Sequence, residues 1–322
     1  MEFPPRGGSR AGGGDDLEID FVPLQRDEPA PRPRAARRES RAARRPDATP
    51  RPRRRGRPRS ETLARVFWVL PWIVFALAVI AVGGVLFAAT MALFACVGLG
   101  EFFRMASDAH PFRPAGFAVG IGLVAAAYFG SQFQIVIVGA AAFPLLFASA
   151  AARPGRGGVV ISLAITVFGI AWIAIPFAHA VLLRELPLHG GALLVDVLVG
   201  TFLTDTCAYF GGRLFGRHPL APQLSPNKTV EGLVLGICGG TFGFWFAGLY
   251  QDWLTGIDAL AIGFCVALIA PVGDLFESMV KRDLRVKDSG RIFGPHGGLL
   301  DRLDAILFTI VVGYYLAVAF VY

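Results

Sequence analysis

The end of the chain contains the stretch that decides the fold. Two apolar runs, FCVALIAPVGDLF (264–276) and AILFTIVVGYYLAVAFVY (305–322), enclose the polar segment KRDLRVKDSGRIFGPHGGLLDRLD (281–304), in which ten of 24 residues are charged. Sustained apolar runs of about 20 residues are typical of helices that span a membrane. The pattern therefore predicts two such helices, joined by a polar segment that is either a surface loop or a working site.

The composition of the whole chain favours a polytopic membrane protein. Of the 322 residues, 54% are hydrophobic and only 17% are charged, and the mean hydropathy is +0.55. A soluble domain would carry about 25% charged residues. Nearly all of the apolar excess lies in residues 66–322, which we interpret as a polytopic membrane catalytic domain.

Residues 1–65 differ from the rest because they are rich in Arg, Pro and Gly. They contain 17 Arg and ten Asp or Glu, so they account for the net charge of +7. Such a segment cannot bury enough apolar surface to offset chain entropy, and we expect a disordered cytoplasmic tail. A basic tail could also contact nucleic acid or anionic lipid. We favour a simple tether and expect no specific nucleic acid partner.

Nine apolar segments follow the tail, and each predicts a helix. They cover roughly 67–83, 85–103, 115–130, 131–151, 158–183, 191–211, 232–250, 258–276 and 303–322. We therefore expect an all-α integral membrane protein with about nine transmembrane helices. The N-terminal helices occupy 66–183, and the catalytic helices and loops occupy 191–322.

The cationic residues predict the orientation of these helices. Lys and Arg in short loops stay on the cytoplasmic side of a membrane. If the Arg-rich tail lies in the cytoplasm, the connections on the opposite side of the membrane carry almost no positive charge. The loops 212–231 and 277–302 then lie together on the cytoplasmic face. We expect a multi-pass protein of the inner (plasma) membrane whose N-terminus and active site face the cytoplasm.

Lysine is used sparingly, and its positions indicate phosphate binding. Only three of the 31 cationic residues are Lys, namely Lys228, Lys281 and Lys287, and all three lie in these two polar loops. A compact ammonium contacts a phosphate as a point charge, which a planar guanidinium does not do. The alternative is a biased codon supply that left three lysines by accident.

Acidic residues accompany the lysines at the same membrane level. Asp274, Glu277, Ser278 and Lys281 are spaced i, i+3, i+4 and i+7, so they share one face of a helix. A carboxylate at membrane depth, as predicted for Asp274, is costly and indicates a functional site with a partner.

Asp301 and Asp304 are also three residues apart, at the start of the last predicted helix. The helix dipole favours acids there, so simple capping is an alternative, and for Asp304 it is as strong as the functional interpretation. Carboxylates that converge from two helices, with cations between them, would bind Mg²⁺ and phosphate, because Mg²⁺ prefers oxygen ligands and leaves positions for substrate phosphates.

The second polar loop contains SPNKTVEG, which offers Ser225, Asn227, Lys228, Thr229 and Glu231 just before a predicted helix. This is a plausible anion-binding helix entrance. The preceding GGRLFGR lacks the ending of a nucleotide-binding P-loop.

At these residues the sequence resembles the phosphatidate cytidylyltransferases, also called CDP-diacylglycerol synthases. The family signature runs S-x-x-K-R-x4-K-D-x-x-x-x-x-P-x-H-G-G-x-x-D-R-x-D. Matching residues run from Ser278 to Asp304, with one local departure at Gly294-Pro295. The stretches that begin at Asp205 (DTCAYFGGRLFGR) and Ser225 (SPNKTVEG) also resemble the family. The matching elements cover about 200–304, and the number of predicted spans agrees over 66–322.

The resemblance implies the reaction CTP + phosphatidic acid → CDP-diacylglycerol + pyrophosphate. It implies Mg²⁺ as cofactor, held by Asp274 and Asp301 with Asp304 as a weaker candidate, and we leave open a second monovalent or divalent cation. The expected catalytic residues are Asp274, Asp301, Lys281 and Lys228. The residues expected to hold phosphates or substrate are Ser225, Asn227, Thr229, Arg282, Lys287, His296, Gly297, Gly298 and Arg302. The residues expected to orient these groups are Asp205, Glu231, Glu277, Ser278 and Asp288.

Several alternatives remain beside this interpretation. His296 lies next to glycines, where a hydrogen-bonded loop residue is more common than a proton shuttle. A CDP-alcohol phosphotransferase would need an acid-rich run that the chain lacks. A transporter would place its acids near the bilayer midplane, and we see no internal repeat that supports one. The expected partners are CTP, phosphatidic acid and membrane lipid, and a homodimer is left open.

Overall fold

The computed structural model describes residues 59–152, 158–290 and 297–322, and of residues 59–70 it describes only the helix. The helices in chain order are α2 (Arg59–Val82), α3 (Gly84–Met105), α4 (Arg113–Phe129), α5 (Gln132–Ala151), α6 (Val159–Gly169), α7 (Ile175–Arg184), α8 (Gly190–Phe215), α9 (Val230–Gly248), α10 (Gly256–Asp283) and α11 (Leu300–Phe320). A short 3₁₀ turn, η1 (Ser107–Ala109), precedes α4, and a π-helical turn, η2 (Ile170–Ala174), joins α6 to α7.

The predicted all-α membrane architecture is confirmed. Every predicted apolar segment coincides with a helix, and α6, η2 and α7 together form the segment predicted at 158–183. Within the described residues, seven helices are long and apolar enough to cross a membrane. The other two apolar helices, Pro71–Val82 and α4, are shorter. Apart from its last residues, which begin α2, the predicted tail lies outside the described residues and stays a prediction.

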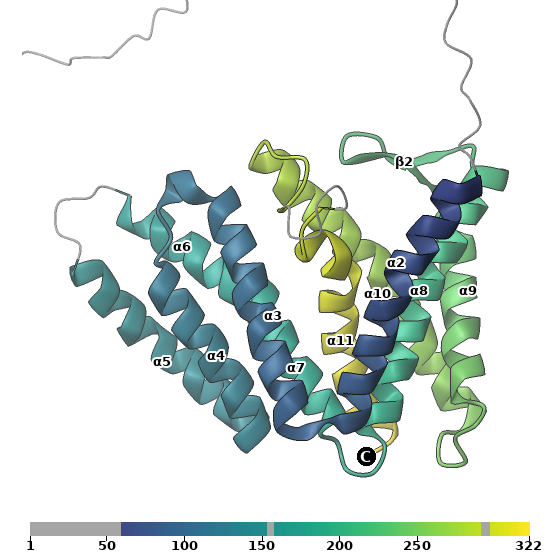
Figure 1. The fold of residues 1–322 in the computed structure, drawn as a ribbon, viewed down its shortest axis with the longest axis horizontal. Helices are drawn as coiled ribbons and strands as arrows, with labels where there is room; N and C mark the ends of the chain where they lie inside the picture. Colours follow the sequence, from purple (N-terminus) through teal and green to yellow (C-terminus); the bar gives the residue numbers. More distant parts are fainter. Residues whose placement is uncertain (1–58, 153–157, 291–296) are drawn as a thin grey trace, which may run out of the picture. The chain divides into compact units, whose positions relative to one another are not determined.

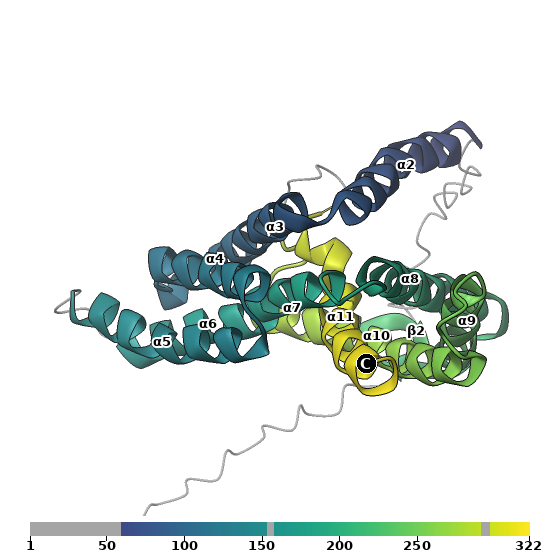
Figure 2. The ribbon, with the colours of Figure 1, turned by 90° about the horizontal axis from the view of Figure 1, so that it is seen from below.

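The helices between residues 60 and 322 form two groups that meet along α7 and α11. Helix α8 packs along α9, α9 along α10, and α10 along α11, while α3 and α4 pack against each other and against α7 (Figure 1). In the view from below, α7 and α11 lie between the helices α4–α6 and the helices α8–α10 (Figure 2). The apolar core is continuous across this boundary, from Phe87 in α3 to Tyr314 in α11.

Small residues let α8 and α9 approach closely. A β-carbon on Gly236 of α9 would lie 2.8 Å from both the Cβ of Ala208 and the carbonyl oxygen of Thr204, so any larger residue would push the two helices apart. Close approach through Gly and Ala is typical of helix pairs in membranes, where van der Waals contact drives association. The antiparallel pair brings the last turns of α8 next to the first turn of α9.

A short hairpin connects α8 to α9, and the sequence did not predict it. Strand β1 (Pro219–Ala221) pairs antiparallel with β2 (Ser225–Thr229). Thr229 ends the hairpin and caps α9, because its Oγ1 accepts a hydrogen bond from the backbone N–H of Gly232 at 3.1 Å. The hairpin therefore places Lys228 at the entrance of α9.

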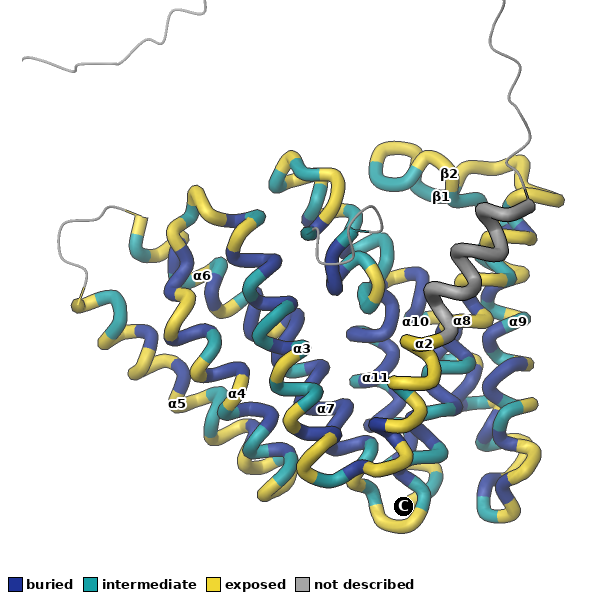
Figure 3. Tube along the Cα trace, in the orientation of Figure 1, coloured by how far each residue is buried: buried dark blue, intermediate teal, exposed yellow. Residues whose placement is uncertain are grey.

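Helix α10 extends further than its predicted segment, 258–276. It begins after the cap residue Thr255 and continues through Asp283, because helical hydrogen bonding is compatible with polar residues once the helix leaves the apolar layer. One face of the helix is fully buried, at Ile262, Val266 and Ala270, whereas Phe264 and Leu268 on other faces are about half exposed. Figure 3 shows this alternation along the central helices, and it is consistent with a helix that contacts lipid.

Candidate active site

Two lysine–carboxylate ion pairs mark the candidate site, and both join separate elements. Lys228 Nζ on β2 lies 2.5 Å from Asp274 Oδ2 on α10. Lys281 Nζ in the last turn of α10 lies 2.7 Å from Asp301 Oδ1 on α11 and 2.8 Å from Glu277 Oε2. The structure thus brings together the four residues that the sequence predicts as catalytic.

A close contact between α10 and α11 positions the acids of this site. A β-carbon on Gly273 would lie 2.5 Å from the carbonyl oxygen of Asp304 and 2.9 Å from Ala305 Cα, so only glycine permits this approach. Asp274, the next residue, interacts electrostatically with Asp304, and both interact with Asp205 of α8. Three helices therefore direct carboxylates at one region.

We call this group of carboxylates the acidic cluster: Asp205, Asp274, Glu277, Asp301 and Asp304. Only two ammonium groups, those of Lys228 and Lys281, form ion pairs with it among the described residues. The cluster therefore has more carboxyl groups than ammonium groups, which favours binding of a further cation. No group of three or more His, Cys, Asp or Glu side chains in the described part of the chain is already arranged to hold a metal ion.

Asp301 is the most extensively hydrogen-bonded acid of the cluster. Its Oδ1 accepts from Lys281, while its Oδ2 accepts from the backbone N–H of Ser289 at 2.9 Å, the Ser289 hydroxyl at 2.9 Å and the backbone N–H of Gly298 at 2.8 Å. Oδ2 is thus held by donors from Ser289 and Gly298, which lie between α10 and α11, whereas Oδ1 is held by Lys281 of α10. Asp301 therefore contacts both α10 and the described residues that connect α10 to α11.

The carboxylate of Asp301 also explains the glycine at position 297 and contacts Gly298. Gly297 has a φ of +87°, in the left-handed region that side chains rarely adopt, and a β-carbon there would lie 2.6 Å from Asp301 Oδ2. Gly298 donates its N–H to that oxygen. The structure thus gives both predicted glycines a place beside Asp301.

The other predicted residues lie at various distances from this centre. Ser278 Oγ lies 3.5 Å from Asp274 Oδ1. Glu231 contacts the hairpin instead of the cluster, since its carboxylate accepts the backbone N–H groups of Arg217 and His218 and pairs with the His218 ring at 2.5 Å. Exposed positions are taken by Asn227, Arg282, Lys287, Asp288 and Arg302, and Ser225 is partly buried on β2. His296 lies outside the described residues.

The sequence interpretation missed Glu101 of α3. Its side chain is fully buried, and it accepts hydrogen bonds from the backbone N–H groups of Leu299 and Leu300, both at 3.0 Å. Ser289 Oγ lies 3.2 Å from Glu101 Oε2. The available signal was a single carboxylate inside the apolar run 85–103, which on its own indicates a functional or structural partner.

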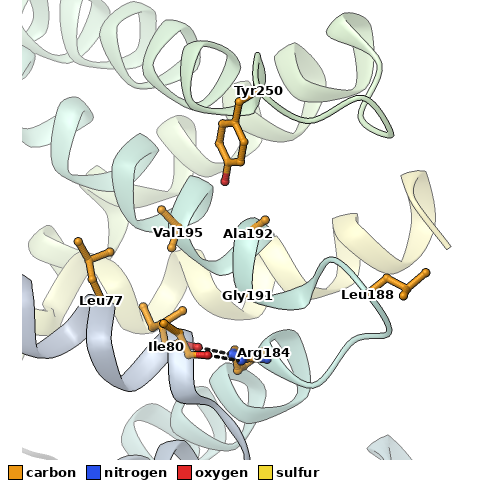
Figure 4. A pocket seen from close by; sticks show the side chains of 9 residues that line it. Leu77, Ile80, Arg184, Leu188, Gly191, Ala192, Val195 and Tyr250 are labelled. Carbon is orange, nitrogen blue, oxygen red and sulfur yellow. Dashed lines mark hydrogen bonds between the residues drawn. The ribbon is translucent and has the colours of Figure 1, made fainter.

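A crevice lies at the opposite end of α8 and α9. Its volume is about 470 Å³, and its walls include Leu77, Ile80, Val195 and Tyr250 (Figure 4). Arg184 lies at its edge and donates from Nε to the carbonyl oxygen of Ile80 at 2.6 Å. Because α8 and α9 each run from this crevice to the acidic cluster, the crevice is not part of the candidate site.

Comparison with known proteins shows to which family this chain is similar. The family model described as the cytidylyltransferase family matches residues 63–320, which is most of the chain. The phosphatidate cytidylyltransferase of Mycobacterium leprae is 39% identical over 150 residues, covering 46% of this chain and 47% of that protein. The protein of the same name from Helicobacter pylori (strain ATCC 700392 / 26695) is 43% identical over 121 residues, covering 37% and 44%. That of Staphylococcus saprophyticus is 40% identical over 152 residues, covering 46% and 56%.

These matches span about half the length of each relative, whereas the family match extends from α2 to the end of α11. The resemblance drawn from the signature residues is confirmed by both. The acids and lysines described above lie within the matched range. The chain belongs to the cytidylyltransferase family.

Proposed function

We propose that this protein is a phosphatidate cytidylyltransferase, which converts CTP and phosphatidic acid to CDP-diacylglycerol and pyrophosphate. The observation that carries the proposal is the pair of ion pairs, Lys228–Asp274 and Lys281–Asp301, at one end of the membrane helices. Both lysines are partly exposed beside an excess of carboxylates, which suits a site for a phosphate-rich ligand with a metal ion. The names of the relatives support the choice of substrates.

The reaction is a nucleotidyl transfer, which the lysines and acids of the candidate site can assist. A phosphate oxygen of phosphatidic acid forms a bond to the α-phosphorus of CTP, and the bond from that phosphorus to the bridging oxygen of the β-phosphate breaks. Pyrophosphate leaves with the electron pair of that bond. Such transfers depend mainly on positioning and charge neutralisation. Lys228 and Lys281 neutralise the phosphate oxygens, and the exposed Arg282 and Lys287 contribute further positive charge.

Mg²⁺ is the cofactor that the acidic cluster suits best. Carboxylate oxygens are hard ligands, and Asp205, Asp274 and Asp304 repel one another electrostatically, so a divalent cation among them would lower their free energy. Asp274 and Asp301 are the first proposed ligands and Asp304 is the third, since all three lie near the close contact of α10 with α11 at Gly273. When bound, Mg²⁺ would neutralise the charge that develops on the phosphates.

We infer the membrane setting from charge distribution. The Arg-rich residues 1–65 and the loops that hold the lysines would lie on the cytoplasmic side of the inner membrane, where CTP is available. Phosphatidic acid would approach sideways from the same leaflet. A homodimer is compatible with this arrangement.

The test uses the full chain reconstituted in vesicles that contain phosphatidic acid. With labelled CTP and Mg²⁺ we expect labelled CDP-diacylglycerol and pyrophosphate in equal amounts, and no lipid product when diacylglycerol replaces phosphatidic acid. Chelation with EDTA should abolish the activity, and added Mg²⁺ should restore it. A wild-type protein that forms no liponucleotide under these conditions refutes the proposed function.

Two matched variants test the site assignment. Asp301→Asn removes the acid that contacts Lys281 and should abolish activity. Asp258→Asn changes an acid in the first turn of α10, where Asp258 accepts from the cap residue Thr255 at the end of α10 that lies away from Lys281, and it should retain near wild-type activity. Wild-type activity in Asp301→Asn would show that the site has been assigned to the wrong residues.

A further inference from the structure

We propose that Glu101 is a positioning residue of the transferase site, through which the N-terminal helices control the geometry of Asp301. The proposal rests on the proposed function and adds to it a residue from α3 that lies outside the signature. It is carried by hydrogen bonds, burial and close packing around one carboxylate.

Glu101 lies in the protein interior, where a carboxylate is stable only if hydrogen bonds compensate its charge. Its side chain is 0% exposed, and it is followed in the chain by Phe102 and Phe103, which are also buried. A buried charge without partners is very costly, so the position requires compensation. The compensation comes from the start of α11, where Leu299 and Leu300 lie 198 and 199 positions further along the chain.

Glu101 caps α11 from another helix. The first backbone N–H groups of a helix have no partner within the helix, and Leu299, at the cap position of α11, offers no side-chain hydrogen bond. The two oxygens of Glu101 accept instead from Leu299 and Leu300, each at 3.0 Å. A negative charge at a helix N-terminus is also favoured by the helix dipole. Glu101 therefore fixes the start of the helix that carries Asp301.

Ser289 connects Glu101 to Asp301 directly. Its Oγ lies 3.2 Å from Glu101 Oε2 and 2.9 Å from Asp301 Oδ2. A hydroxyl has a single proton to donate, so Ser289 can satisfy only one of the two carboxylates at a time. The position of each acid thus depends on the other through this one side chain.

Two glycines leave the space that the Glu101 carboxylate occupies. A β-carbon on Gly290 would collide with Glu101 Oε1, and a β-carbon on Gly298 would lie 2.5 Å from each Glu101 oxygen. These glycines lie on either side of residues 291–296. One carboxylate from α3 thus contacts the connection both before and after that segment.

The consequence is an ordered series of contacts from α3 to the reacting groups. Glu101 accepts hydrogen bonds from Ser289 and from the start of α11. Ser289 also donates to Asp301, and Asp301 accepts from Lys281 at 2.7 Å. A misplacement of about 1 Å in a catalytic group can lower the rate about 100-fold. We therefore expect Glu101 to affect the rate of the chemical step more than CTP binding.

A purely structural role is the alternative, and the chain provides a matched control for it. Glu185 also accepts a backbone N–H from a distant helix start, that of Gly84 at 3.1 Å, but at the opposite end of the bundle. Glu101→Gln and Glu185→Gln make the same chemical change at a carboxylate that accepts a backbone N–H from a helix start, although the contact of Glu185 is exposed and that of Glu101 is buried. Only the first is expected to alter the transferase site.

The experiment measures kcat per CTP-binding site, with the site concentration obtained from binding of labelled CTP, so that unfolded protein is not counted. Glu101→Gln should lower kcat about 100-fold with a change in KM for CTP below about threefold. It should also speed trypsin cleavage after Arg285. Glu185→Gln should keep the wild-type kcat and the wild-type cleavage rate.

A double-mutant cycle tests whether Glu101 acts through Ser289. Ser289→Ala should lower kcat about tenfold, and the double variant should lose about 100-fold, whereas independent effects would multiply to about 1000-fold. A kcat for Glu101→Gln within about threefold of wild type, or an equal loss in Glu185→Gln, overturns the proposal. If Glu101→Gln does not fold, wild-type kcat in Ser289→Ala overturns it. A wild type without activity refutes the proposed function alone, and trypsin cleavage then still tests the contacts of Glu101.

Discussion

Replacing Lys281 by Met should reveal how strongly the site depends on one ammonium group. Lys281 contacts Glu277 at 2.8 Å and Asp301 at 2.7 Å, with only 16% of its side chain exposed. Glu277 is 1% exposed, and its Oε1 has no hydrogen-bond partner among the described residues. The substitution therefore leaves a buried carboxylate with no compensating charge, whereas Asp301 retains its donors from Ser289 and Gly298.

The magnitude follows from this burial. Removing one partner of a buried ion pair costs about 3–5 kcal/mol, because the other charge stays buried without compensation. The low exposure of both side chains means that solvent screens the pair only weakly. Each kcal/mol lowers the Tm of a domain of this size by about 2–4 °C, so Lys281→Met should lose about 6–20 °C.

The assay is thermal unfolding of the purified protein in detergent, followed by circular dichroism of the helices. The double variant Lys281→Met/Glu277→Gln should recover most of the lost Tm, because the buried charge is gone, but it should remain inactive. Lys287→Met is the matched control: Lys287 is exposed and forms no ion pair with another described residue, so the expected change is about 2 °C or less.

Two outcomes would refute this reasoning. One is a Tm of Lys281→Met within about 2 °C of wild type, which would mean that the ammonium does not compensate Glu277. The other is a double variant no more stable than Lys281→Met, which would place the cost elsewhere.

Three further predictions concern neighbouring positions. Lys228→Gln should lower kcat/KM for CTP about 100-fold but change Tm little, because Lys228 and Asp274 are both partly exposed; steady-state kinetics with unchanged KM and kcat would contradict this. Gly297→Ala should cost about 1–2 kcal/mol from its positive φ and reduce activity, measured beside Gly139→Ala, a helix position with open space around it, which should be neutral or slightly stabilising. Thr229→Ala should lower the free energy of unfolding by about 1 kcal/mol by removing the cap of α9, whereas Thr229→Ser should keep it, as thermal unfolding will show.

Much of the fold follows from local sequence. The apolar segments predicted helices in the right places, since the length of a membrane span is set by the bilayer and is visible as an unbroken apolar run. Their ends were less predictable. Helix α10 continues to Asp283 although the apolar run ends near Phe276, because backbone hydrogen bonds do not stop where hydrophobic side chains stop. The hairpin β1–β2 has no alternating apolar pattern to reveal it.

For the candidate site too, some features follow from the sequence and others depend on the tertiary structure. The signature from Ser278 to Asp304, the scarcity of lysine and the acids at membrane depth are properties of sequence alone, and they identified the residues that form the two ion pairs. Which lysine contacts which acid depends on the close approach of α10 to α11 at Gly273 and on the hairpin that presents Lys228. Glu101 belongs to the site only because α3 packs beside the start of α11, almost 200 residues away. Side-chain shape across a helix interface decides such contacts, and no local periodicity records them.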